Sequence, residues 1–271
     1  MEDNHSVHKI CVLGLGYIGL PTAALLATNG FAVVGVDVNP MVVEAVNRAT
    51  VPIAEPGLAT LLKAAVNSGN LVARSEAEPA DAFIIAVPTP VSEEKKADLS
   101  YIAQAAESIR PLLVPGNLVI LESTSPPGTT RNFLAPVLAR SGLVAGQNLL
   151  VAHCPERVLP GRILKELIGN DRIIGGLTKE SAEAAKAIYA RFVEGQIHLT
   201  DATTAEMVKL MENTYRDVNI ALANELAVIC AELDISAWEV IRRRAAGFAV
   251  YVLGAGKDRP SEVKLVALGA Q

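Results

Sequence analysis

The feature that most constrains this fold is a glycine-rich turn between two apolar segments near the N-terminus. An apolar strand over residues 10–13 leads into Gly14-Leu15-Gly16-Tyr17-Ile18-Gly19, and an apolar helix is expected over 17–28. A second apolar run over 31–36 then ends in Asp37. Strand, glycine turn, helix, strand and acid in this order are typical of a dinucleotide-binding βαβ unit, with an ordinary βαβ unit as the alternative.

The three glycines of this turn have separate physical roles in such a unit. Gly14 allows the tight turn, Gly16 lets the backbone approach a pyrophosphate that a β-carbon would strike, and Gly19 permits close packing of helix on strand. The start of the helix offers free N–H groups and a partial positive charge to the phosphates. We therefore predict that a cofactor is bound by Gly14, Gly16, Tyr17, Ile18 and Gly19.

Asp37 indicates which dinucleotide is bound. The acid lies about 20 residues after the glycines, where a carboxylate accepts hydrogen bonds from the adenosine ribose hydroxyls. A 2′-phosphate would be repelled there, and the following Asn39, Pro40 and Met41 offer no cation. The sequence therefore predicts NAD rather than NADP, and it predicts no metal site.

The composition excludes several classes of protein. The 271 residues are 51% hydrophobic and 20% charged, with a net charge of −5, so nucleic acid and anionic membrane are poor partners. The three cysteines, Cys11, Cys154 and Cys230, suggest no disulfide framework and fit a reducing cytoplasm. The polar, acidic residues 1–5 are no signal peptide, and no apolar stretch reaches membrane-spanning length.

Three further loops are expected at the carboxyl edge of a parallel sheet, where doubly wound folds bind ligands. They follow apolar strands over 82–87, 118–121 and 149–152. These loops read Pro88-Thr89-Pro90, Glu122-Ser123-Thr124-Ser125-Pro126-Pro127-Gly128 and His153-Cys154-Pro155-Glu156-Arg157-Val158-Leu159-Pro160-Gly161. We predict Thr89 and Thr124 as hydroxyl donors to NAD, with loop caps as the alternative for both.

The sequence pattern changes after residue 200. Thr203-x-x-Glu206 reads as a capping box, and a helical apolar period then runs to about residue 233, before a second capping pair at Ser236 and Glu239. The fold predicted is α/β, a doubly wound and mostly parallel Rossmann sheet followed by a helical domain led by one long helix. Its parts are an NAD-binding domain over 1–200, the helical domain over 201–245 and a divergent tail over 246–271.

Several of these blocks together resemble a known family. The segments 14–21, 87–90 and 122–128 are similar to those of the nucleotide-sugar 6-dehydrogenases that act on UDP-glucose and GDP-mannose. Segment 154–161 narrows the resemblance to the members that oxidise UDP-N-acetyl-D-mannosamine, over residues 8–242 in all. So does Glu206-Met207-Val208-Lys209-Leu210-Met211-Glu212-Asn213-Thr214-Tyr215-Arg216-Asp217-Val218-Asn219-Ile220.

The resemblance implies a cytoplasmic, NAD-dependent enzyme that oxidises the C6 alcohol of a UDP-sugar to a carboxylate for surface polysaccharide synthesis. Two NAD would be reduced per turnover: an aldehyde forms, a cysteine captures it as a thiohemiacetal, and water hydrolyses the thioester that results. The family has a third, UDP-binding domain and dimerises through its long central helix. A homodimer through residues 203–233 is therefore expected.

The resemblance also assigns roles on the long helix. Lys209 would act as acid and base or stabilise an oxyanion at C6, and Asn213 would hydrogen-bond the same oxygen. Arg216 would contact the substrate. The three residues fall at i, i+4 and i+7, so a solvated helix face is the alternative.

The loop after the strand at 149–152 carries the other assigned residues. Glu156 would position or activate the hydrolytic water, with a loop salt bridge as the alternative. Arg157 would contact the substrate by charge and Val158 through its backbone. Cys154 is expected to be structural, because the family's nucleophile lies in a later glycine-rich loop, and Cys11 and Cys230 are expected to be small buried hydrophobes.

The resemblance ends after Arg242. The family continues through a His-Pro-Arg segment to a loop ending in Gly-His-Cys, whereas this chain reads Arg243-Arg244-Ala245-Ala246-Gly247-Phe248 and has no later cysteine. A shifted reading frame or a truncated gene would give such a tail. We therefore expect a shortened chain that binds NAD and is inactive.

Two other functions remain open. A β-hydroxyacid dehydrogenase shares a Rossmann domain, a long helix and a helical lysine and needs no cysteine, although the 154–161 loop weighs against it. A catalytically inactive NAD-binding or dimerising module is the second alternative, and the shortened end favours it.

Overall fold

The computed structural model describes residues 7–243, 250–253 and 264–267. The chain divides into two compact units, Met1–Lys209 and Leu210–Gln271. The long helix α8, Ala202–Glu232, contributes residues to both units. The domain boundaries at residues 200 and 245 stay predictions.

The first unit is built on an 8-stranded sheet in the order β3-β2-β1-β4-β5-β6-β7-β8. Its strands are β1 Lys9–Leu13, β2 Ala32–Val36, β3 Leu71–Arg74, β4 Ala82–Ile85, β5 Leu118–Leu121, β6 Leu150–His153, β7 Arg172–Gly176 and β8 Ile197–Asp201. Neighbouring strands pair in parallel except β6 and β7, which are antiparallel. The predicted mostly parallel sheet is confirmed, and its first six strands have the order of dinucleotide-binding folds.

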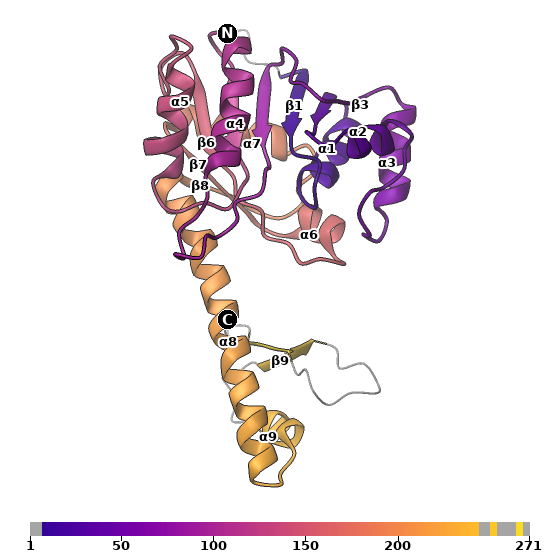
Figure 1. The fold of residues 1–271 in the computed structure, drawn as a ribbon, viewed down its shortest axis with the longest axis vertical. Helices are drawn as coiled ribbons and strands as arrows, with labels where there is room; N and C mark the ends of the chain where they lie inside the picture. The colour runs from indigo at the N-terminus through magenta and orange to yellow at the C-terminus, as the bar shows by residue number, and fades with distance from the viewer. Residues whose placement is uncertain (1–6, 244–249, 254–263, 268–271) are drawn as a thin grey trace. The chain divides into compact units, whose positions relative to one another are not determined.

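Helices cover both faces of this sheet (Figure 1). One face packs on α1 Gly19–Thr28, α2 Pro40–Asn47, α3 Leu58–Asn67, α6 Ile163–Gly169 and α7 Lys179–Tyr189, and the other on α4 Ser100–Ile109 and α5 Ala135–Ala139. The central strands β4 and β5 are apolar throughout because both of their faces are covered. In β1, Ile10 and Val12 join one core, while Cys11 and Leu13 join the other.

The register aligns the carboxyl ends of four strands. Leu13 pairs with Ile85, Ile85 with Leu121, and Leu121 with His153. The loops after β1, β4, β5 and β6 therefore start on one line, which spans about 14 Å because neighbouring strands lie about 4.8 Å apart. This edge carries most of the residues that the sequence assigns to the site.

Several local features differ from the sequence-based expectations. The sequence pattern does not predict α6 or the edge strand β8. In β8 the alternation of apolar and polar residues is too short to indicate a strand. The helix expected over 130–139 begins as a π-helical turn, Thr130–Leu134, before α5. The capping box at Thr203 is wrong: α8 begins at Ala202, and the Asp201 carboxylate accepts hydrogen bonds from Thr204 N at 3.1 Å and Thr204 Oγ1 at 2.5 Å.

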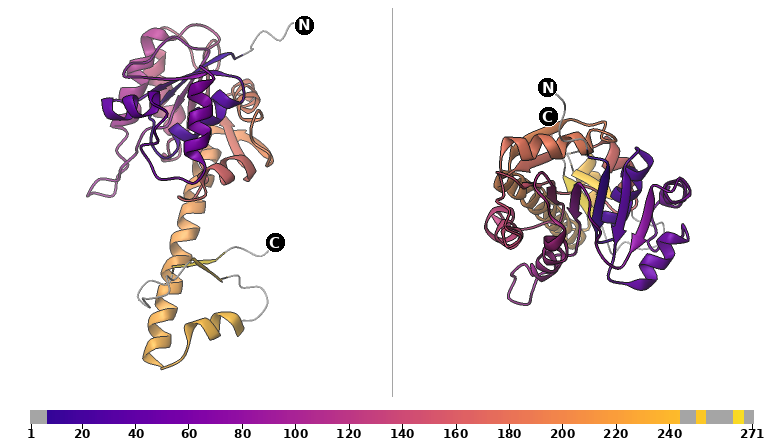
Figure 2. Two further views of the ribbon diagram at one scale, coloured as in Figure 1. Left: turned by 90° about the vertical axis from the view of Figure 1, so that its right-hand side faces the viewer. Right: turned by 90° about the horizontal axis from the view of Figure 1, so that it is seen from above.

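The second unit contains the rest of α8, the helix α9 Ala237–Arg243, and an antiparallel pair of strands, β9 Val250–Leu253 and β10 Lys264–Ala267. Ser236 caps α9 as predicted, since its Oγ accepts from Glu239 N at 3.4 Å. Figure 2 shows α8 as one long helix in orange, which confirms the predicted long helix. Among the described residues, no helix is both long and apolar enough to cross a bilayer.

Candidate functional site

The glycine turn after β1 is shaped by backbone contacts that leave no room for side chains at two positions. Gly14 has φ +94°, and a Cβ on it would lie 2.5 Å from the Ala86 carbonyl oxygen. A Cβ on Gly19 would lie 1.8 Å from the Gly14 carbonyl oxygen. Because this contact fixes the start of the helix, α1 begins at Gly19 and not at Tyr17, which corrects the expected boundary.

Gly16 lies in a different environment from the other two glycines. A Cβ on Gly16 would meet nothing within 4 Å, and the Tyr17 side chain beside it is 53% exposed. The turn therefore leaves open space next to the backbone at the N-terminal end of α1. Such a space fits a pyrophosphate, so the residues of the turn fit NAD.

Asp37 connects the end of β2 to this turn. Its Oδ2 accepts a hydrogen bond from Leu15 N at 3.0 Å, and its Oδ1 accepts one from Asn39 N at 2.9 Å. The carboxylate thus lies beside the glycine turn, where a ribose hydroxyl would be recognised. The position of Asp37 beside the turn is consistent with the predicted contact with ribose, and that contact stays a prediction.

The loops after β4 and β5 are joined through hydroxyl groups. Thr89 Oγ1 donates to the Thr124 carbonyl oxygen at 2.7 Å, and Ser123 Oγ donates to the Val87 carbonyl oxygen at 2.7 Å. The first of these bonds brings together the two threonines that the sequence assigns to NAD. It also shows Thr89 acting on the neighbouring loop, which is the alternative the sequence left open.

The structure brings Glu156 and Lys209 together beyond the end of β6. Both side chains are buried, with 7% and 9% of their surface exposed. Burial raises the pKa of Glu156, while the charges of Arg172 and Lys209 and the N–H groups of Arg157 and Val158 lower it. A carboxylate and an ammonium in a nearly dry site can exchange protons with a substrate and stabilise charge that develops on it.

A buried ionic cluster lies next to this pair, and the sequence motifs do not signal it. Arg172 Nη1 lies 3.5 Å from both Glu122 Oε1 and Cys154 Sγ, and Tyr189 OH donates to Glu122 Oε1 at 2.7 Å. Burial raises the pKa of Glu122 to about 7, and the Arg172 charge and the Tyr189 hydrogen bond limit that rise. Glu122 could have been singled out from the sequence, because it is an acidic residue directly after an entirely apolar strand.

Cys154 has the properties of a structural residue. It has no exposed surface, and burial raises the pKa of its thiol to about 11. A thiol with so high a pKa is a poor nucleophile. The three cysteines of the chain are free and buried, as expected.

The remaining predicted residues lie in two places. Arg157 Nη1 donates to the Asp171 carbonyl oxygen at 3.1 Å, and the Arg157 carbonyl accepts from Asn170 Nδ2 at 3.0 Å, so the loop is tied to the start of β7. Asn213 and Arg216 lie on the part of α8 that belongs to the second unit. The substrate contacts of Arg157, Val158, Asn213 and Arg216 stay predictions.

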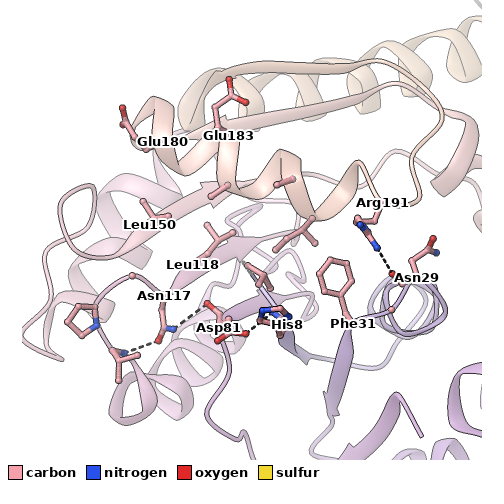
Figure 3. A pocket seen from close by; sticks show the side chains of 18 of the residues that line it. His8, Asn29, Phe31, Asp81, Asn117, Leu118, Leu150, Glu180, Glu183 and Arg191 are labelled. Carbon is pink, nitrogen blue, oxygen red and sulfur yellow. Dashed lines mark hydrogen bonds between the residues drawn. The ribbon is translucent and has the colours of Figure 1, made fainter. Parts of the chain in front are cut away.

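An open hollow of about 1070 Å³ lies at the opposite edge of the sheet, where the strands begin (Figure 3). None of the predicted site residues lines it. Asp81 Oδ2 accepts from the His8 and Lys9 N–H groups at 2.8 Å, and Asn117 Nδ2 donates to the Ala80 carbonyl oxygen at 3.0 Å. These polar groups satisfy the protein's own backbone, so we assign no ligand to this hollow.

Two sequence profiles match the chain. The NAD binding domain of the UDP-glucose/GDP-mannose dehydrogenase family matches residues 8–193, and the central domain of that family matches residues 203–248. Together they cover the glycine turn, the carboxyl-edge loops and Lys209.

Individual relatives agree with these profiles. A UDP-N-acetyl-D-mannosamine dehydrogenase from Methanococcus maripaludis is 56% identical over 245 residues, which are 89% of this chain and 56% of the relative. An NDP-N-acetyl-D-galactosaminuronic acid dehydrogenase from Ralstonia solanacearum is 52% identical over 86% of this chain and 56% of its own length. A solved UDP-D-ManNAc dehydrogenase from Pyrococcus horikoshii superposes with a TM-score of 0.84 at 45% identity, over 89% of this chain and 60% of that one. The chain thus spans little more than half the length of the curated relatives it matches.

Proposed function

The chain belongs to the UDP-glucose/GDP-mannose dehydrogenase family, and on that premise we propose that it forms the NAD-binding and lysine-bearing part of a UDP-N-acetyl-D-mannosamine 6-dehydrogenase. Such an enzyme oxidises the C6 alcohol of the sugar to a carboxylate. The observation that carries the proposal is the buried pair of Glu156 and Lys209 at the sheet edge that also holds the glycine turn.

The chemistry assigned to each residue follows from its charge and burial. When bound, NAD accepts the hydrides that leave C6 in the two oxidation steps. Lys209 stabilises the negative charge on the C6 oxygen as its proton leaves, and Asn213 donates a hydrogen bond to that oxygen. Glu156 orients the water whose oxygen ends in the carboxylate and takes up a proton from it, a role that its raised pKa favours.

The substrate class is proposed from the relatives. Those named above are a UDP-N-acetyl-D-mannosamine dehydrogenase and an NDP-N-acetyl-D-galactosaminuronic acid dehydrogenase, and both names support a nucleotide-linked N-acetylated sugar, for which we propose a UDP-N-acetylhexosamine. The proposed substrate contacts are Arg157 by charge, Val158 through its backbone and Arg216 on α8.

The proposed location is a reducing cytoplasm, which the three free, buried cysteines support.

The proposed assembly is a homodimer through α8. Among the large apolar side chains exposed on this helix, six follow a helical spacing, namely Met207, Met211, Tyr215, Val218, Leu222 and Ile229. A stripe of this kind favours burial against a second copy. Light scattering should show a dimer at micromolar concentration, and Leu222→Glu should shift it to monomer; a monomeric wild-type chain would refute the dimer.

The cofactor part of the proposal is tested by calorimetry on this chain. NAD should bind the wild-type protein, and Gly16→Val should abolish binding, because the side chain fills the space that the pyrophosphate needs. Asp81→Asn, at the opposite edge, serves as the control and should bind NAD as the wild type does. Unchanged NAD affinity in the Gly16→Val protein would contradict the assignment.

The chemical part is tested in a chimera. Residues 8–242 of this chain would replace the matching part of the Methanococcus maripaludis relative, and NADH formation with UDP-N-acetyl-D-mannosamine would be measured. The chimera should be active, and Lys209→Ala should lower kcat by about a hundredfold or more, the scale expected for loss of oxyanion stabilisation. Full activity in the Lys209→Ala chimera would rule out the proposed role of that residue.

A further inference from the structure

Glu206 is a buried carboxylate on α8 that binds a distant loop. Its side chain has no exposed surface. Oε2 accepts a hydrogen bond from Gly128 N at 2.5 Å, and Oε1 accepts from Thr130 N at 2.7 Å and from Thr130 Oγ1 at 2.6 Å. Hydrogen bonds to an ionised acceptor are roughly twice as strong as neutral ones, so this contact is a firm link between segments 76 to 78 residues apart.

The loop that Glu206 binds is built to present these donors. Pro127 and Gly128 occupy the central positions of a turn, with Gly128 at φ +90° and Thr129 N donating to the Pro126 carbonyl oxygen at 3.1 Å. A proline followed by a glycine with positive φ is the signature of a type II turn. The helical segment that starts at Thr130 has no local side-chain cap, and its first N–H group, that of Thr130, donates instead to the Glu206 carboxylate.

Glu206 lies between two parts of the proposed site. On the loop side, the chain from Gly128 leads back to Thr124, whose carbonyl is held by Thr89 Oγ1 at 2.7 Å. On the helix side, Lys209 follows Glu206 by one turn of α8 and couples to Glu156. The loop over residues 122–129, called the Thr124 loop here, is thus held near Thr124 by Thr89. At its other end it is held by α8, the helix that carries Lys209.

We propose that Glu206 is a positioning residue, which fixes the Thr124 loop to the Lys209 helix and so shapes the nicotinamide half of the dinucleotide site. This inference rests on the proposed function, because it assumes that NAD binds along this edge. The glycine turn and Asp37 form the first mononucleotide-binding half, and the loops after β4 and β5 belong to the second. A change at Glu206 therefore acts on the half of NAD that adenosine diphosphate lacks.

The test compares NAD with ADP by calorimetry on the full chain. Glu206→Gln keeps the shape of the side chain but places an amide donor against a backbone N–H donor. NAD affinity should fall by about tenfold, the loss expected when one buried charge-assisted hydrogen bond is broken. ADP affinity should stay within about twofold, because the adenosine half is a separate site. Glu206→Ala should widen the difference.

Two further measurements separate positioning from general destabilisation. Amide hydrogen exchange should rise at Gly128 and Thr130 in Glu206→Gln and stay unchanged across residues 14–19. The control is Asp81→Asn, since Asp81 also accepts two backbone N–H groups but lies at the opposite edge of the sheet. It should leave both nucleotide affinities unchanged.

The outcomes distinguish this inference from the proposed function. Wild-type NAD affinity in Glu206→Gln, together with loss of NAD binding in Gly16→Val, would overturn the positioning role and leave the cofactor site standing. Equal losses of NAD and ADP affinity in Glu206→Gln would also overturn it, since they indicate a general structural defect. If Gly16→Val still binds NAD, the proposed function itself fails.

Discussion

The two halves of the carboxyl edge are built in opposite ways. The turn after β1 is made of backbone, and at Gly16 it borders open space. The loops after β5 and β6 contain the buried carboxylates Glu122 and Glu156, and a third, Glu206, reaches the loop after β5 from α8. The first half therefore depends on side chains being absent, and the second depends on side chains that satisfy one another.

This difference decides how each half should respond to substitution. In the first half, a methyl group added to a glycine should lower the stability of the fold where backbone atoms lie close to it. It should leave stability unchanged where no atom is near. In the second half, removal of one charge leaves its partner buried and uncompensated, which costs more than the pair contributes.

The largest expected effect is on folding, at Gly19. Gly19→Ala places a Cβ 1.8 Å from the Gly14 carbonyl oxygen, so strand and helix must separate, at about 3 kcal/mol of stability by analogy with overpacked cores. Gly16→Ala should change stability little, because its Cβ meets nothing within 4 Å. Urea unfolding measures both, and equal stabilities in the two variants would contradict the contrast.

A loss of similar size is expected in the second half, at Arg172. Arg172→Met removes the cation that lies 3.5 Å from Glu122 Oε1 in a buried site, and loss of one partner of such a pair costs about 3 kcal/mol. Glu122 should then stay protonated in the folded state while it ionises in the unfolded chain. Stability should therefore fall more steeply as pH rises from 5 to 8 than in the wild type, and restoration by the double variant Arg172→Met/Glu122→Leu is the check.

A smaller, pH-dependent effect is expected at His153, the last residue of β6. Its ring is fully buried, and burial lowers its pKa to about 3 from the ordinary 6.5. The unfolded chain therefore binds a proton below pH 6.5 that the folded chain does not, and stability falls as pH falls toward 3. His153→Leu should remove about 1.6 kcal/mol of the loss between pH 6.5 and 5, as urea unfolding at both values would show.

The smallest effect is expected at Asp37. Asp37→Ala removes the acceptor for Leu15 N and for the ribose hydroxyls, so NAD affinity should fall by about tenfold, the value of one or two hydrogen bonds. Discrimination against NADP should relax, because the repulsion of a 2′-phosphate is gone. Asp37→Asn is the matched control, which keeps an acceptor and loses the charge; unchanged NADP discrimination in both variants would count against the ribose contact.

The sequence predicts the first half of the edge better than the second. Glycine spacing, apolar strands and Asp37 are local signals, and the structure places all of them as expected apart from the start of α1 at Gly19. The contacts of Glu206 with Gly128 and of Arg172 with Glu122 join residues far apart in the chain. The local pattern Thr203-x-x-Glu206 predicted a capping box wrongly. The Glu206 carboxylate instead accepts hydrogen bonds from buried N–H groups of the loop after β5.

The most direct test of the whole account is amide hydrogen exchange with and without NAD. NAD should slow exchange in two separate segments, residues 14–19 after β1 and residues 122–130 after β5, and leave residues 180–191 beside the opposite hollow unchanged. Protection confined to residues 180–191, or absent from both loops of the carboxyl edge at saturating NAD, would contradict it.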